Sequence, residues 1–360
     1  MNILNNPHRG VGLPSLPVEA SETVSRDVNA VLSLLQACPV AKPTPLVSLQ
    51  SLADKLGVAS LSVKDERGRM GLGSFKSLGA TYAIAKAAVA ANGGKVGSPS
   101  EMENVLAGSV YVTASAGNHG VSTAAGARIF GARAVIYLSE TVPGGFAEKL
   151  RSFGAEVVIE GANYEASHEA AMAASESKGW TLIADSTWVG YNGGRDIMEG
   201  YLAMPAEAAD QIAEPPTHLF LQAGVGGLAA AGARHARMVW GDSPVICVVE
   251  PSAAPALAAA IEAGEVVHAD GPVSNMGRLD CKEASLLALD CLAIEADAFM
   301  TLEDEFVAQA ITALAAEQMT TSPSGGAGFA GLVAAAQAKA LGLDGKSRVL
   351  IYLSEGPSDD

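Results

Sequence analysis

The sequence predicts an α/β protein with two domains, each built on a mostly parallel sheet flanked by helices. From residue 109 onward, short apolar β-rich runs alternate with stretches of helical length, which is typical of parallel strands joined by helices. Three Gly-containing loops follow predicted strands, at the sheet edge where ligands bind in open α/β folds. The 360 residues are 49% hydrophobic and 17% charged, so the chain can bury a large core.

The individual elements follow from these runs and from the positions of Pro and Gly. Strands are predicted at residues 61–63, 109–113, 134–138, 156–159, 181–184, 218–222, 244–250 and 348–353. Helices are predicted at residues 21–37, 49–56, 76–91, 118–130, 145–153, 164–178, 228–239, 283–288, 302–318 and 328–341. Pro39, Pro43 and Pro45 end the first helix, because proline cannot continue one. The rest of residues 1–40, and the Gly- and Ser-rich residues 92–100, are expected to form loops.

Charge and composition exclude several kinds of partner. The net charge of -16 disfavours nucleic acid and anionic membranes, which attract basic proteins. The N-terminus lacks a basic and apolar leader, and no apolar run is long enough to span a membrane. The 4 cysteines show no metal-ligand or redox spacing, which indicates free thiols in a reducing compartment. We therefore expect a cytoplasmic protein.

Lys76 is the residue around which the chemistry is organised. It follows Gly73, Ser74 and Phe75 and lies in the first turn of a predicted helix. The start of a helix is electropositive because its amide N–H groups are unpaired, so it is a poor place for a lysine that only needs solvation. A lysine that forms an imine, with the anionic part of a cofactor nearby, fits this position better. A solvated lysine on a helix surface is the alternative.

A Gly-containing loop at residues 115–120 follows the predicted strand at 109–113. Its glycines let the backbone approach a ligand closely, and the helix after it offers free N–H groups, which suits a carboxylate. A tight strand-to-helix turn would need the same glycines. Asn118 and His119, which stand between them, add some support for a functional loop.

Another loop, between the predicted strand at 218–222 and a helix, is rich in glycine. Its residues are Gly224, Val225, Gly226, Gly227 and Leu228. Three glycines before a helix form a cradle for phosphate. Ala229 and Glu250 also fit the spacing of a dinucleotide-binding loop, so spacing alone leaves both interpretations open. Lys76, which a dinucleotide enzyme does not need, favours a single phosphate.

These loops and Ser354, at the end of the last predicted strand, can converge on one crevice. A lysine for an aldehyde, a cradle for a phosphate and a hydroxyl for a ring nitrogen together suit pyridoxal 5'-phosphate.

At these residues the chain resembles the fold type II pyridoxal phosphate enzymes, which include tryptophan synthase β and the serine/threonine dehydratases. The resemblance rests on the motifs Gly73-Ser74-Phe75-Lys76, Gly117-Asn118-His119-Gly120, Gly224-Val225-Gly226 and Ser354-Glu355-Gly356. The run from Asp185 to Tyr191 is most similar to the diaminopropionate ammonia-lyase branch. The resemblance implies a tryptophan synthase β-like fold, a small amino-acid substrate and a homodimer. It also implies a large cofactor-binding domain (residues 1–84 and 187–360) and a small substrate-side domain (residues 85–186).

The same resemblance implies roles for individual residues. Lys76, next to Phe75, would carry the cofactor and take the α-proton. Asn118 would meet the ring hydroxyl, Ser354 the ring nitrogen, and residues 224–228 the phosphate. Asp185 would assist the departing β-group, although a turn or helix cap is its alternative role. The substrate carboxylate would bind at the loop formed by Ser115, Ala116, Gly117, Asn118 and His119.

Two departures from the ammonia-lyase pattern fall on the substrate side. Ala116 stands where the pattern has an aspartate, and the segment after Tyr191 is shorter and contains Arg195. Arg195 is a candidate for a substrate contact because guanidinium suits a carboxylate; an ion pair with Asp196 or Glu199 is the alternative.

The expected reaction is α,β-elimination of ammonia from a small β-substituted L-amino acid such as 2,3-diaminopropionate. A serine/threonine- or hydroxyaspartate-type dehydratase is the alternative among enzymes. A non-catalytic binding protein on the same fold is the alternative from another class.

Overall fold

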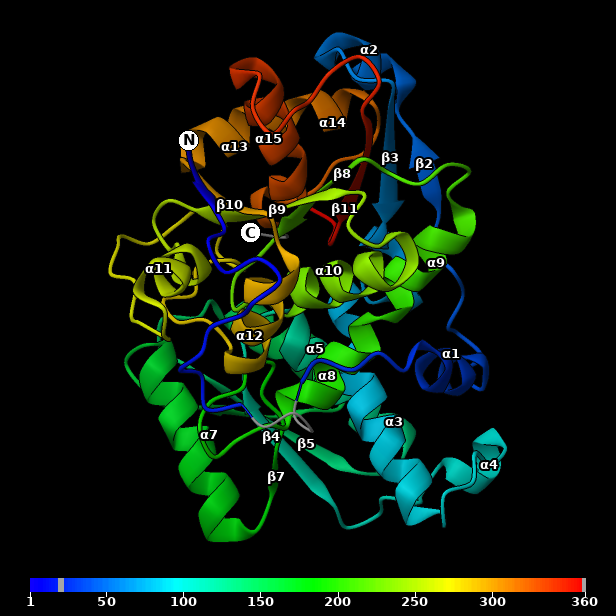
Figure 1. The fold of residues 1–360 in the computed structure, drawn as a ribbon. Helices are drawn as coiled ribbons and strands as arrows, with labels where there is room; N and C mark the ends of the chain where they lie inside the picture. The colour runs from blue at the N-terminus through cyan, green and yellow to red at the C-terminus, as the bar shows by residue number, and fades with distance from the viewer. Residues whose placement is uncertain (19–22, 358–360) are drawn as a thin grey trace.

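The computed structural model describes residues 1–18 and 23–357 and confirms the α/β architecture, with strands in two separate sheets (Figure 1). The larger sheet contains, in spatial order, β1 (Asn2–Asn5), β10 (Ala298–Leu302), β9 (Val245–Pro251), β8 (His218–Gln222), β11 (Arg348–Leu353), β3 (Ser60–Asp65) and β2 (Leu46–Ser48). Its inner strands are parallel, whereas β1 and β2 pair antiparallel at its two edges.

The smaller sheet is parallel throughout. Its spatial order is β6 (Glu156–Ile159), β5 (Arg133–Leu138), β4 (Val110–Ala114) and β7 (Thr181–Leu182). These strands all come from the segment 85–186 that is expected to form a small domain, but the domain boundary itself stays a prediction.

Helices cover both faces of the larger sheet (Figure 1). One face carries α2 (Gln50–Leu56), α13 (Asp304–Ala310), α14 (Thr312–Ala316) and α15 (Pro323–Ala338). The face toward the smaller sheet carries α9 (Ala203–Gln211), α10 (Gly227–Trp240), α11 (Ala256–Ala263) and α12 (Leu286–Glu295). The helices around the smaller sheet are α3 (Ala80–Ala91), α5 (Asn118–Ile129), α6 (Gly144–Ser152) and α7 (Tyr164–Lys178). α8 (Gly194–Tyr201) packs against both α3 and α10 and so joins the two halves. Two further helices, α1 (Val28–Gln36) and α4 (Pro99–Met102), lie near the surface.

Several element predictions are wrong. The predicted helix at 302–318 is present as α13 and α14, separated at Ile311, but it begins only at Asp304 because Leu302 pairs with β9 as the end of β10. β10 is covered on both faces and therefore shows no polar alternation that would mark it as a strand. The predicted helix at 21–37 begins only after Asp27, whose carboxylate caps α1 by accepting the Ala30 N–H at 2.9 Å; residues 21 and 22 lie outside the described residues. The elements that were not predicted are β1, β2, β10, α4, α8, α9 and α11.

The start of α15 also differs from the prediction, for a reason of packing. The helix begins at Pro323 and not at residue 328, although its first turns are rich in glycine. A Cβ at Gly328 would lie 2.8 Å from the Phe220 carbonyl oxygen, and one at Gly325 2.9 Å from the Glu355 carbonyl oxygen. Close packing against the larger sheet thus requires glycine at the start of this helix, although glycine by itself favours a loop.

A buried ionic cluster fixes the chain just before Lys76. Lys64 Nζ lies 2.8 Å from Glu207 Oε2, and Arg69 binds Glu66 and Glu207, each at 2.7 Å. All four side chains are buried. Because charges without partners are very costly in a protein interior, the cluster holds β3 and the following 3₁₀ helix, Glu66–Gly71, against α9. The loop that carries Lys76 therefore starts from a fixed point.

Candidate active site

The predicted site residues other than Arg195 lie at the carboxyl ends of five strands. Lys76 is in a 3₁₀ helix, Phe75–Leu78, that follows β3, and the loop at 224–227 follows β8. Ser354 ends β11, which lies between β3 and β8 in the larger sheet. The loop at 115–120 and Asp185 follow the neighbouring strands β4 and β7 of the smaller sheet. The site is thus built from both sheets.

Lys76 and Asp185 form an ion pair between the two halves of the site. Their side chains are 21% and 22% exposed. Burial by itself lowers the pKa of Lys76, but the negative charge of Asp185 outweighs it and raises that pKa above its ordinary value. Burial likewise raises the pKa of Asp185, and the Lys76 ammonium more than offsets it, so this pKa lies well below its usual range. Both groups are therefore charged at neutral pH.

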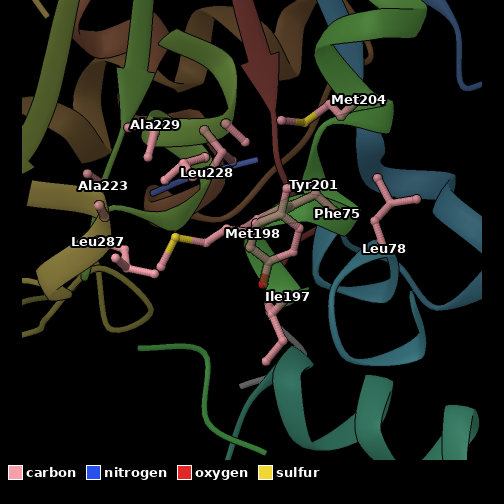
Figure 2. Close-up of a cluster of buried hydrophobic side chains, with 14 of the residues drawn as sticks. Phe75, Leu78, Ile197, Met198, Tyr201, Met204, Ala223, Leu228, Ala229 and Leu287 are labelled. Carbon is pink, nitrogen blue, oxygen red and sulfur yellow. The ribbon is translucent and has the colours of Figure 1, made fainter. Parts of the chain in front are cut away.

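Two aromatic rings lie beside this ion pair. The Phe75 and Tyr201 rings lie close together (Figure 2), with their centroids 4.8 Å apart. Lys76 Nζ lies 5.5 Å from the Phe75 centroid and 5.9 Å from that of Tyr201. Tyr201 fits because Gly79 leaves room for it: a Cβ there would lie 2.6 Å from the tyrosine ring. The buried Tyr201 hydroxyl has no hydrogen-bond partner among the described residues. The rings restrict where the Lys76 amine can reach.

The loop at 224–227 is shaped so that side chains cannot fill it. A Cβ at Gly224 would lie 2.9 Å from Cys281 Sγ, and one at Gly226 2.9 Å from Ala288 Cβ. Gly226 has a φ of +104°, which glycine tolerates best. α10 begins at Gly227, so the amides of Gly227 and Leu228 have no acceptor within the helix. This is the backbone of an anion-binding cradle.

The loop at 115–120 presents backbone amides at the start of α5. Ser115 Oγ accepts the N–H groups of Gly117 and Gly120 at 3.2 and 3.1 Å. Burial lowers the pKa of His119, which keeps its ring neutral, and its Nε2 lies 2.8 Å from the Ile183 carbonyl oxygen. The ring is 5% exposed and is held by backbone, so the Asn118 and His119 amides are better placed than the imidazole to bind a carboxylate. Ala116 is exposed.

The end of β11 holds two polar side chains with different surroundings. Ser354 Oγ accepts a hydrogen bond from Gln222 Nε2 at 3.0 Å. Gln222 Nε2 also donates to the carbonyl oxygens of Gly325 and Tyr352, which fixes the orientation of its amide. The Ser354 hydroxyl proton is therefore directed to another acceptor. Glu355 Oε2 accepts from Asn118 Nδ2 at 2.5 Å and lies 3.2 Å from Arg278 Nε.

Glu355, Arg278 and Tyr201 are residues for which the sequence suggested no role. Glu355 is buried; this raises its pKa, although Arg278, Ser322, Lys76 and Asn118 each act in the opposite direction. The sequence did contain one indication of a role for Glu355, because it is a charged residue just after an apolar strand and next to Ser354. Arg278 and Tyr201 are brought to the site by a long loop and by α8, and no local pattern marks either.

Arg195 lies in the first turn of α8, and its Nε donates to the Thr23 carbonyl oxygen at 3.2 Å. The acidic residues considered as its alternative partners, Asp196 and Glu199, pair instead with Lys86, at 2.7 and 2.6 Å. A substrate contact for Arg195 stays a prediction.

This set of groups fits an aldehyde cofactor that carries a phosphate. Lys76 supplies an amine, the glycine loop offers backbone amides where a side chain would clash, and Ser354 retains a proton for a ring nitrogen. The Asn118 amide is oriented by Glu355, and its second N–H can meet a ring hydroxyl.

Comparison with known proteins agrees with the resemblance seen in the sequence. The family model described as "Pyridoxal-phosphate dependent enzyme" matches residues 38–355. Diaminopropionate ammonia-lyase of Salmonella typhimurium is 32% identical over 91% of this chain and 88% of its own length.

Two solved structures of the Escherichia coli diaminopropionate ammonia-lyase are similar over 99% of this chain and 94% of theirs. One, in complex with D-serine, has a TM-score of 0.89 at 27% identity. The other, in complex with an aminoacrylate-PLP azomethine reaction intermediate, has a TM-score of 0.86 at 26% identity. The fold type expected from the sequence motifs is thus confirmed.

Proposed function

The chain belongs to the pyridoxal-phosphate-dependent enzyme family, and we propose that it releases ammonia from a small β-substituted L-amino acid such as 2,3-diaminopropionate. It is a carbon–nitrogen lyase, and the products are a 2-oxo acid and ammonia. The observation that carries the proposal is the ion pair between Lys76 and Asp185, which places two proton-handling groups side by side next to the glycine loop.

Lys76 would hold pyridoxal phosphate through its aldehyde, residues 224–228 its phosphate, Asn118 its ring hydroxyl and Ser354 its ring nitrogen. When bound, the cofactor supplies an electron sink for the carbon that loses the α-proton. Ser354 is a neutral hydroxyl and cannot stabilise a positive charge on the ring nitrogen as a carboxylate would. This favours prompt loss of the β-substituent over transamination.

The remaining chemistry is proton handling by this chain's own residues. The amides of Asn118 and His119 bind the substrate carboxylate, which fixes the direction of the α-hydrogen. The amine of Lys76, released when substrate binds, accepts the α-proton at Nζ. The Asp185 carboxylate lies beside that amine and passes a proton from the Lys76 ammonium to the departing β-amine, which then leaves as neutral ammonia. The Phe75 and Tyr201 rings exclude water from one side of the amine.

A substrate panel tests this function. We expect 2,3-diaminopropionate to give the highest kcat/KM, with two molecules of ammonia released for each 2-oxo acid. Serine, threonine and hydroxyaspartate would give one. A hydroxyamino acid as the best substrate would identify the alternative, a dehydratase. Cofactor binding without turnover of any panel member would favour a binding protein.

We also propose that the enzyme is a homodimer in the cytoplasm. The support is the family resemblance, together with the lack of disulfides among the described cysteines. No helix in the described part of the chain is long and apolar enough to cross a membrane. Light scattering should give twice the chain mass of 36.5 kDa, and a monomer would contradict the dimer.

A further inference from the structure

Two hydroxyl side chains connect the glycine loop to the segment that carries Asp185. The Val225 carbonyl oxygen accepts the Ser285 N–H at 3.0 Å. Ser285 Oγ accepts the Thr187 N–H at 2.9 Å and lies 2.8 Å from Thr187 Oγ1. Thr187 is two residues after Asp185. A hydrogen-bonded path thus runs from the expected phosphate site to Thr187, from which two peptide bonds lead to Asp185.

The path also includes the start of α12. The Leu287 N–H donates to Thr187 Oγ1, and the Leu286 N–H to the Thr187 carbonyl oxygen, both at 2.9 Å. Thr187 is 2% exposed and Ser285 0%. Because water does not reach these groups, loss of one hydroxyl would leave buried donors without acceptors, and each such loss is costly.

The segment around Asp185 is also held from its other side. The Tyr191 hydroxyl accepts the Ala184 N–H at 2.9 Å. Gly194 packs so closely that a Cβ there would lie 2.6 Å from the Ser186 carbonyl oxygen. With these contacts fixed, the orientation of the Asp185 carboxylate depends on where Thr187 is anchored, and that anchor is the glycine loop.

We propose that Thr187 and Ser285 are positioning residues that couple occupancy of the glycine loop to the placement of Asp185. This inference rests on the proposed function, because it takes the loop to hold the cofactor phosphate. A ligand that orders the loop fixes Ser285, which fixes Thr187 and so directs Asp185 toward Lys76. The coupling is reciprocal, as all linked binding equilibria are, so weakening the link must weaken cofactor binding.

The test compares T187V, which has the same shape without the hydroxyl, with T187S, which keeps it. We expect T187V to bind pyridoxal phosphate about tenfold more weakly, the effect of one or two lost buried hydrogen bonds, and T187S to restore binding. The second readout is the pH at which the visible absorbance of the bound cofactor changes. A well-placed Asp185 carboxylate favours the protonated form, so the midpoint should fall in T187V and recover in T187S.

A double-mutant cycle separates positioning from a general loss of structure. D185N alone should lower the same midpoint, and T187V should lower it no further in the D185N background. An equal additional shift in that background, or unchanged binding and midpoint in T187V, would overturn the proposal. If T187V does not fold, S285A is measured with the same readouts and the same criteria. None of these measurements requires turnover. The inference can therefore fail while the proposed lyase activity stands, and the lyase activity can fail while the inference stands.

Discussion

The Lys76 ammonium lies against the Asp185 carboxylate, although the two residues are 109 positions apart and follow strands of different sheets. The pair therefore exists only where the two halves of the molecule meet. We expect D185N to keep the cofactor bound but to lower kcat by about 10²–10⁴-fold, the usual contribution of a positioned acid or base. Steady-state kinetics with 2,3-diaminopropionate, alongside cofactor absorbance, measure both. A D185N protein with normal kcat would remove Asp185 from the mechanism.

Lys76 should be the attachment point of the cofactor, because its amine lies 5.5 Å from the centre of the Phe75 ring and pairs with Asp185 at the strand ends that also carry the glycine loop. Borohydride treatment of the yellow holoenzyme should fix the cofactor to the peptide that contains Lys76. K76A should show neither attachment nor turnover, and K76R, which keeps the charge opposite Asp185, should separate loss of the amine from loss of the ion pair. A K76A protein that is still labelled would contradict the assignment.

The enzyme should prefer L-substrates. Proton removal needs a base on the face from which the α-hydrogen points, and Lys76 serves one face. Ala116, where the resembling lyases have an aspartate, has no group to serve the other. Solvent deuterium incorporation and 2-oxo acid release, measured for each enantiomer separately, should be fast only for the L-form. Comparable rates would reveal a second base, and A116D should create some activity toward the D-form.

Gly200 should be a sensitive position for stability and for the placement of Lys76. A Cβ there would lie 2.2 Å from the Leu78 carbonyl oxygen and 2.8 Å from Tyr82 Cβ, so α8 would have to move away from the Lys76 turn. We expect G200A to cost about 1–3 kcal/mol in unfolding free energy and to weaken cofactor binding.

The matched control for G200A is G145A. Gly145 is also in a helix, α6, but a Cβ there has no neighbour within 4 Å. Alanine should be neutral or stabilise this helix by up to about 1 kcal/mol. Equal effects of the two substitutions in urea unfolding would show that helix propensity, and not packing, decides.

Glu250 should make stability fall as pH rises. Burial raises its pKa to about 8 from an ordinary value of 4.5, despite hydrogen bonds from the Leu257 and Ala258 amides. Between these values the folded protein holds a proton that the unfolded chain has released, so this contribution is complete below 4.5 and is lost as pH rises through 8.

The measurement is urea unfolding from pH 5 to 9. E250Q, whose side chain does not titrate, should give a flatter pH dependence than the unsubstituted protein, whereas E262Q, an exposed substitution at the end of α11, should not change the slope. Parallel curves for E250Q and the unsubstituted protein would contradict the assignment.

The sequence by itself determined the parts whose function depends on local backbone. The segment before Lys76, the glycine loop at 224–227 and the loop at 115–120 each join a strand to a helix. Each contains a glycine that the local backbone requires: Gly73 and Gly226 have positive φ, and a Cβ at Gly120 would lie 2.7 Å from the Ser115 carbonyl oxygen. The combination of Lys76 with these loops, and not the spacing of any one of them, indicated the cofactor class. The buried parallel strand β10 and the glycine-rich start of α15 were misread, because their patterns depend on what covers them.

Only the tertiary structure decided which side chains face one another. Asn118 meets Glu355, Thr187 meets Ser285, and Tyr201 lies between Phe75 and α10 through contacts among segments far apart in the chain. No local pattern encodes such pairs, because each depends on how two sheets and the helices between them pack. The chain specifies the turns through backbone conformation. The charges of Lys76 and Asp185 depend on their ion pair, which outweighs burial and exists only once the two halves have packed together.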